Sequence, residues 1–271
     1  APPRSRRHRL MLIQLVHLGR VDYGTALQLQ RTLVELRHQQ RIGDTLLLLE
    51  HPPVITLGRN AHEENVLLSR ESLSQKGVDL FETNRGGDVT FHGPGQLVGY
   101  PIFDLRGFSP RVGAVEYVRR VEEVLIRACA EFGILCGRIP GLTGVWTQAE
   151  PARKIAAIGV HISRGITSHG FALNINTDLE YFKLIVPCGI SDKPVTSIEH
   201  EIDLRSRKMP SFEEVANSIS ANFGRVFGRQ MLWCESLDVL LRSADAPSNE
   251  DIPAQAPEEL RQLRGEDLHL A

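Results

Sequence analysis

The chain has 271 residues, of which 42% are hydrophobic, and its 31 basic and 33 acidic residues give a formal net charge of −2. This length is enough for a sizeable core in one large domain, and the near balance of charge argues against general nucleic-acid binding. No apolar run approaches the roughly 20 residues that a membrane-spanning helix needs, which predicts a soluble protein that does not bind membranes.

The first half of the chain predicts strands that alternate with helices. Asp22 is a suitable N-cap for the first helix, because a short acidic side chain accepts hydrogen bonds from the first backbone N–H groups. A strand over 78–83 leads into the glycine-rich run 84–96, so we expect this run to be a loop between two strands. The predicted strands are 10–18, 46–49, 54–57, 78–83 and 97–105, and the predicted helices are 22–40 and 69–75.

The second half predicts one long amphipathic helix and a group of strands. Apolar residues recur at helical spacing from Val112 to Phe132, and Gly133 forms the C-terminal stop. Arg164 and Gly165 indicate a tight turn between two strands. The predicted strands are 134–139, 144–147, 154–163, 166–176 and 230–234, with another helix over 212–227. Hairpins with flanking helices favour an α+β fold with mixed β-sheets over a regular parallel sheet.

No linker divides the chain, so we expect one domain with two tails. The first nine residues hold four arginines and no acid, which indicates a disordered basic tail rather than the remnant of a targeting peptide. From about Arg242 the chain lacks apolar periodicity. We therefore expect a tail over 1–9, a folded domain over 10–235 and a mostly disordered tail over 236–271.

The glycine-rich run 84–96 is the densest local signal. It holds four glycines, Pro94, Arg85 and His92, which is typical of a rigid pocket wall with few side-chain atoms. Its spacing fits neither a phosphate-binding P-loop nor a dinucleotide fingerprint. The alternative is an ordinary glycine-rich hairpin.

The cysteines separate into two kinds. The chain has no Cys-x-x-Cys pair, which favours free thiols in a reducing compartment. Cys188 stands apart because Pro187 and Gly189 hold it in a constrained turn, and it is the candidate nucleophile; the alternative is a cysteine that merely fills a turn. The cysteines in apolar segments are expected to lie in the core: Cys129, Cys136 and Cys234.

Lys154 is the candidate partner for such a nucleophile. A thiolate attacks acyl carbonyls and needs a nearby base or cation, because an ordinary thiol is mostly protonated at neutral pH. Lys154 opens the apolar strand 155–160, where an amine can be partly desolvated. The alternative is a solvated lysine at a strand end.

Two histidines are each followed by glycine. His92 and His169 are therefore candidates for orienting an acyl group or a base. The histidines and cysteines do not occur at zinc-binding spacings, so we expect no metal.

Four motifs in order resemble one family. The runs 85–96, 154–159, 168–174 and 187–189 are similar to the octanoyltransferases of lipoate biosynthesis, the LipB family. The resemblance covers roughly residues 10–234. It implies a biotin/lipoate protein ligase-like fold and transfer of an octanoyl group from acyl carrier protein to a lysine of a lipoyl domain, in 2-oxoacid dehydrogenase E2 subunits or the glycine cleavage H protein.

The resemblance also implies roles for individual residues. Cys188 carries the acyl group as a thioester, Lys154 lowers the pKa of its thiol, and neither ATP nor a metal is required. Phe91 departs from the family pattern, where tyrosine is common, and the lost hydroxyl is expected to alter at most one pocket hydrogen bond. The implied substrate-contacting residues are Arg85, Gly86, Gly87, Asp88, Val89, Thr90, Phe91, His92, Ala157, Ile158, Gly159, Gly170, Phe171 and Ala172.

Three alternative functions stay open. These are an ATP-dependent lipoate or biotin protein ligase of the same fold, an amidotransferase between two lipoyl proteins, and a non-catalytic module that binds acyl carrier protein. Cys188 between Pro187 and Gly189 argues against the ligase, and a cysteine paired with a lysine argues against the binding module. The amidotransferase also uses a cysteine, and the motif set favours acyl carrier protein over a lipoyl protein as the donor. We expect a monomer in the cytoplasm, with the mitochondrial matrix as the lesser possibility.

Overall fold

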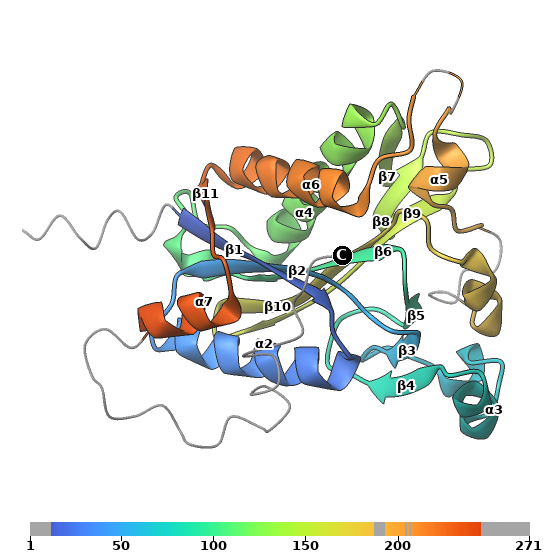
Figure 1. The fold of residues 1–271 in the computed structure, drawn as a ribbon, viewed down its shortest axis with the longest axis horizontal. Helices are drawn as coiled ribbons and strands as arrows, with labels where there is room; N and C mark the ends of the chain where they lie inside the picture. Colours follow the sequence, from blue (N-terminus) through green and yellow to red (C-terminus); the bar gives the residue numbers. More distant parts are fainter. Residues whose placement is uncertain (1–11, 187–192, 204, 206, 245–271) are drawn as a thin grey trace, which may run out of the picture.

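The computed structural model describes residues 12–186, 193–203, 205 and 207–244. They form an eight-stranded mixed sheet, in the order β11-β1-β2-β6-β10-β9-β8-β7, and a three-stranded sheet, in the order β4-β3-β5 (Figure 1). The elements of the first half are β1 (Leu12–Arg20), α2 (Tyr23–His38), β2 (Asp44–Glu50), β3 (Val54–Leu57), α3 (Arg70–Gln75), β4 (Asp79–Glu82), β5 (Val89–His92) and β6 (Gln96–Ile102). Those of the second half are α4 (Ala114–Glu131), β7 (Cys136–Ile139), β8 (Leu142–Thr147), β9 (Lys154–Ser163), β10 (Ile166–Asn174), α5 (Ile198–Glu201), α6 (Phe212–Phe227), β11 (Gln230–Trp233) and α7 (Leu237–Ala244). Short 3₁₀ turns occur at Glu63–Asn65, Leu105–Gly107 and Leu179–Leu184.

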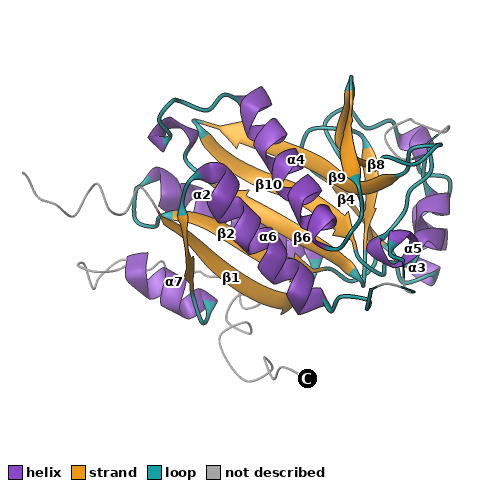
Figure 2. Cartoon of the chain, turned by 90° about the horizontal axis from the view of Figure 1, so that it is seen from above, coloured by secondary structure: helices purple, strands orange, loops and turns teal. Residues whose placement is uncertain are grey.

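Helices cover both faces of the large sheet. Helices α4 and α6 pack on one face, and α2 and α7 lie on the other (Figures 1 and 2). Strand β2 is buried on both faces, which explains its run of leucines. Leu46 and Leu48 belong to the apolar cluster under α4 and α6, whereas Leu47 and Leu49 belong to the cluster under α2. A strand that is buried on both faces has no polar positions to alternate with.

Local signals explain where several elements begin and end. The Asp22 carboxylate accepts a hydrogen bond from the Thr25 N–H at 2.8 Å, which confirms it as the N-cap of α2. Gly133 follows the end of α4 with φ +81°, a conformation that favours glycine. Arg164 and Gly165 both have positive φ in the tight turn between β9 and β10.

Two predictions are wrong. The run 84–96 is not one loop, because β5 lies inside it and pairs antiparallel with β3. The predicted C-terminal tail begins too early, because 237–244 form α7. Leu237 and Leu240 of α7 are buried in the apolar cluster under α2, and eight residues are too few to show clear helical periodicity.

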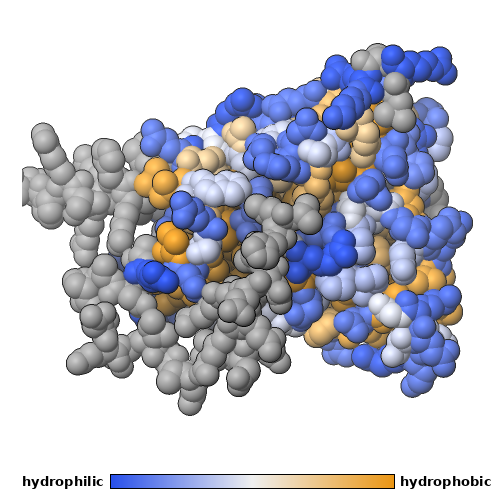
Figure 3. All heavy atoms as spheres, in the orientation of Figure 1, coloured by the Kyte–Doolittle hydropathy of each residue, from blue (hydrophilic) through white to orange (hydrophobic). Residues whose placement is uncertain are grey.

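Among the described residues, no helix is long and apolar enough to cross a membrane. The face seen in Figure 3 is mainly hydrophilic, with small hydrophobic patches between polar residues. The predicted core cysteines Cys129, Cys136 and Cys234 are buried thiols outside any disulfide.

Candidate active site

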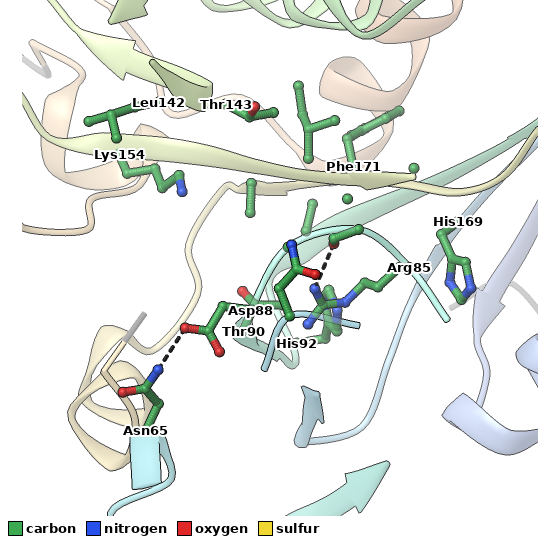
Figure 4. A pocket seen from close by; sticks show the side chains of 18 of the residues that line it. Asn65, Arg85, Asp88, Thr90, His92, Leu142, Thr143, Lys154, His169 and Phe171 are labelled. Atoms are coloured by element: carbon green, nitrogen blue, oxygen red, sulfur yellow. Dashed lines mark hydrogen bonds between the residues drawn. The ribbon is translucent and has the colours of Figure 1, made fainter. Parts of the chain in front are cut away.

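A cavity of about 590 Å³ lies where the large sheet meets the small one. It is elongated along β9 and β10, since its lining runs from Lys154 to His169, which pairs with Val160. Val160 is six residue steps along β9 from Lys154, a length of about 20 Å. Figure 4 shows Lys154 and His169 toward opposite ends, with Arg85 and His92 between them. Small residues line the middle, where Ala157 pairs with Ala172 and Gly159 with Gly170.

Arg85 is held rigidly against β3. Its Nη2 donates to the Thr56 carbonyl at 2.6 Å and to the Thr56 hydroxyl at 2.9 Å, and its Nη1 donates to the Gly86 carbonyl at 3.1 Å. The neighbouring backbone is attached to β9, because the Gly86 N–H donates to the Val160 carbonyl at 2.9 Å. A Cβ at Gly159 would lie 2.7 Å from the Gly86 carbonyl oxygen, so this close approach requires glycine. The glycine-rich run is therefore a pocket wall, as predicted.

Two buried histidines, His92 in the cavity wall and His51 behind it, are neutral near pH 7. Burial lowers the pKa of His92 to about 3 and that of His51, behind the cavity, to about 4. The Gln96 Nε2 donates to the side-chain Oδ1 of Asn174 at 2.9 Å, so the Gln96 Oε1 lies toward His92 Nδ1, at 2.8 Å. The His92 Nδ1 therefore carries the hydrogen. His51 Nε2 lies 2.7 Å from the hydroxyl of Tyr100, whose pKa burial raises.

His169 closes the far end of the cavity in an unusual backbone conformation. Its φ is +54°, and its N–H donates to the Gln30 side chain at 2.7 Å. Burial lowers the pKa of its ring to about 3, and Nε2 lies 2.7 Å from the Asn84 oxygen. Neutral rings with such low pKa values are suited to orienting a ligand and are poor proton acceptors near neutral pH.

Lys154 lies at the other end and projects into the cavity (Figure 4). It is 8% exposed, which excludes the solvated lysine considered above. Its backbone N–H donates to the Pro194 carbonyl at 2.8 Å, and its carbonyl accepts from the Thr196 N–H at 2.9 Å. Its Nζ lies 5.0 Å from the centre of the Trp146 ring. A buried amine at one end of a cavity lined by polar and apolar groups is suited to holding or moving a proton.

Comparison with known proteins gives the family. The model of the lipoyl protein ligase A/B catalytic domain matches residues 22–224. The octanoyltransferase of Koribacter versatilis is 63% identical over 259 residues, covering 96% of this chain and 100% of that protein. The octanoyltransferase of Acidobacterium capsulatum is 61% identical and covers 85% of this chain and 96% of its own length.

The chain belongs to the octanoyltransferase family.

Solved structures of lipoate ligases share the fold. Lipoate-protein ligase A bound with ATP superposes with a TM-score of 0.67 at 17% identity, covering 86% of this chain and 93% of that one. The bipartite lipoate protein ligase of Thermoplasma acidophilum gives 0.61 at 16% identity, with 86% and 90% covered. At these identities the likeness concerns the fold alone, and it confirms the predicted α+β, lipoate ligase-like architecture.

Most of the residues expected in this octanoyltransferase site do line the cavity. The lining includes Lys154 and twelve of the substrate-contacting residues inferred from the sequence: Arg85, Gly86, Gly87, Asp88, Thr90, His92, Ala157, Ile158, Gly159, Gly170, Phe171 and Ala172. Val89 and Phe91 are exceptions. They alternate with Thr90 and His92 along β5 and therefore face away, into an apolar cluster where the Phe91 ring stacks on Tyr181 at 4.7 Å. Their side chains are thus not part of the cavity lining, and substrate contact at these two positions stays a prediction.

Other lining residues were missed by the sequence reasoning. They come from the start of α2, the loop after β3, β6 and the β7–β8 turn, and they carry no motif that marks them. Asn65 is an example, because its amide donates to Asp88 at 2.6 Å across the cavity wall (Figure 4). The missed residues are Tyr23, Asn60, His62, Glu64, Asn65, Tyr100, Gly141, Leu142 and Thr143.

Cys188 lies outside the described residues. The chain on either side of it is attached at the cavity. Before it, the Val186 N–H donates to the carbonyl of Asn65 at 2.8 Å; after it, Pro194 and Thr196 bind the Lys154 backbone. No three His, Cys, Asp or Glu side chains of the described residues are grouped as metal ligands.

Proposed function

We propose that this octanoyltransferase transfers an octanoyl group from acyl carrier protein to a lysine of a lipoyl domain, through a thioester on Cys188 with Lys154 as the proton carrier. The observation that supports it most is the buried Lys154 amine at one end of the cavity, on a strand whose backbone binds the segment that follows Cys188. The lipoyl domains of 2-oxoacid dehydrogenase E2 subunits and the H protein are the proposed acceptors.

The first half-reaction forms the acyl-enzyme. The Cys188 thiol gives its proton to the Lys154 amine, and the thiolate attacks the carbonyl carbon of the donor thioester. The new carbon–sulfur bond forms as the bond to the carrier thiol breaks. The carrier sulfur takes the proton from Lys154 and leaves as a thiol.

The second half-reaction forms the amide. The neutral amine of the acceptor lysine attacks the carbonyl of the acyl-enzyme, and the bond to Cys188 breaks. The proton that the acceptor nitrogen loses passes through Lys154 to the Cys188 sulfur, which restores the enzyme. An amide is more stable than a thioester, so the proposed reaction needs no ATP and no metal.

The middle of the cavity suits the acyl chain. Ala157, Ala172, Gly159 and Gly170 leave space along β9 and β10, and each buried methylene contributes roughly 0.8 kcal/mol. At the far end, the buried His169 ring presents an Nδ1 atom that has no hydrogen-bond partner among the described residues and that an apolar chain cannot satisfy. We therefore expect the cavity to favour chains that stop before it.

The test is mass spectrometry of the protein after incubation with octanoyl-acyl carrier protein. The proposal expects one octanoyl group on the peptide that contains Cys188, and its transfer to an added lipoyl domain without ATP. An octanoyl group on another residue, or none, contradicts the mechanism. A strict requirement for ATP would favour a ligase, and a lipoyl protein as the required donor would favour an amidotransferase. Binding of the carrier without acylation would favour a binding module.

A further inference from the structure

The side chain of Lys154 packs against Gly144 and Trp146 of β8. A Cβ built at Gly144 would lie 2.8 Å from Lys154 Cε and 2.8 Å from the Ala156 carbonyl oxygen, distances that real Cβ atoms do not show. The φ of Gly144 is +127°, which other residues rarely adopt. On the same strand, the Trp146 ring lies 5.0 Å from the ammonium nitrogen. Gly144 and Trp146 together form the surface that supports the lysine.

The pairing of β8 with β9 is irregular at this point. Val145 pairs with Ala156, but Trp146 pairs with Lys154, so Ile155 is an extra residue on β9. Such a bulge changes the direction of the neighbouring side chains. Here Ile155 and Ala156 are both in the core, whereas Lys154 lines the cavity. The position of the amine therefore depends on how β8 is held.

A buried carboxylate of α4 forms a hydrogen bond to the backbone of β8. Glu122 of α4 is 0% exposed, and its Oε1 accepts a hydrogen bond from the Gly144 N–H at 3.2 Å. Its Oε2 accepts from Arg119 of α4 at 2.7 Å and from Arg138 of β7 at 3.0 Å. One carboxylate thus joins α4, β7 and β8. Glu122 is not among the residues that line the cavity, so it touches no substrate there.

We propose that Glu122 is a positioning residue, which fixes Gly144 and through it the surface of β8 that holds the Lys154 amine in the cavity. The inference rests on the proposed function only for the statement that Lys154 acts in the transfer. The position of the amine is a separate, measurable quantity.

The first test measures transfer by full-length variants. Gly144→Ala is expected to lower kcat on the order of 100-fold with KM for octanoyl-acyl carrier protein within about 2-fold, because its methyl group meets Lys154 Cε and the Ala156 carbonyl at the amine end of the cavity, away from the Gly159 and Gly170 pair. Glu122→Leu is expected to lower kcat on the order of 10-fold, and Glu122→Gln, whose oxygen can still accept from Gly144, is expected to retain most of it. Gly228→Ala is the control for backbone strain, because Gly228 also has positive φ but has open space around its Cβ and lies outside the site.

The second test observes the amine directly. The chain has two tryptophans, so Trp233→Phe leaves Trp146, beside Lys154, as its one tryptophan, and excitation selective for tryptophan reports on that ring. An ammonium over the ring should give its emission a pH transition, and this transition should be absent when Lys154→Met is added. Gly144→Ala is expected to abolish the transition, Glu122→Leu to weaken it and Glu122→Gln to keep it.

The outcomes separate the two proposals. A Trp146 transition that is unchanged in Gly144→Ala and Glu122→Leu, in variants that melt like the parent, overturns the positioning role. Equal losses in Glu122→Gln and Glu122→Leu, with a lower melting temperature in both, also overturn it in favour of a purely structural ion pair. If the transition disappears as expected while kcat stays the same, the positioning role holds and the proposed part of Lys154 in the transfer fails.

Discussion

Acidification from pH 7.5 to pH 5.5 is expected to destabilise the folded chain through three histidines buried at the cavity. Burial lowers the pKa of His51 to about 4 and those of His92 and His169 to about 3. An unfolded histidine has a pKa of about 6.5. The unfolded state thus takes up protons below pH 6.5 while the folded state does not, so the stabilisation present above pH 6.5 is lost as the pH falls toward the folded pKa values.

The magnitude follows from this difference. At pH 5.5 each histidine is expected to lower the free energy of unfolding by about 1.4 kcal/mol relative to pH 7.5, and the three together by about 4 kcal/mol. These figures change little if a folded pKa moves by a unit, because the folded values lie well below pH 5.5. Asp44 acts in the opposite direction, since burial raises its pKa. The comparison of variants is therefore the decisive measurement.

The assay is urea unfolding followed by circular dichroism at both pH values. The parent is compared with His51→Gln, His92→Gln and His169→Gln, and the m-value should be the same at both pH values. Each variant is expected to show a pH dependence smaller by about 1.4 kcal/mol than that of the parent. A variant with the same pH dependence as the parent would refute the reasoning for that histidine.

Three further predictions concern the site and the fold. Lys154→Met should slow formation of the acyl-enzyme in a single turnover on the order of 100-fold or more while the protein stays folded. Acyl-enzyme formation at the rate of the unsubstituted protein would show that another group carries the proton. Ala172→Val should reduce transfer of octanoyl groups more than of hexanoyl groups, measured as the ratio of kcat/KM, because it narrows the middle of the cavity; an unchanged ratio would place the chain elsewhere. Leu240→Ala should lower the free energy of unfolding by about 2–5 kcal/mol, because Leu240 is 0% exposed in the cluster under α2, and no loss would mean that α7 does not contribute to the core.

Local interactions made several elements predictable from the sequence. The N-cap at Asp22, the stop at Gly133 and the turn at Arg164 and Gly165 depend on residues close in the chain, and the structure has all three. The four ordered motifs were sufficient to indicate the family and the fold, because their glycines and polar residues are rare in that combination.

Other features depend on distant partners. Strand β5, within the glycine-rich run, forms because its backbone pairs with β3. Helix α7 is stabilised by the packing of Leu237 and Leu240 in the apolar cluster under α2. A short segment has too little intrinsic preference to reveal such a structure before it packs.

The sequence by itself indicated which family this chain belongs to and three stretches that line its cavity, within 85–96, 154–159 and 168–174. Only the tertiary structure decided which side chains of those stretches meet. Strand alternation sends Thr90 and His92 into the cavity and Val89 and Phe91 into the apolar core, and the bulge on β9 aims Lys154 at the same space. The direction of a side chain is set by the strand that pairs with its own and by what covers each face, and both come from residues far away in the chain.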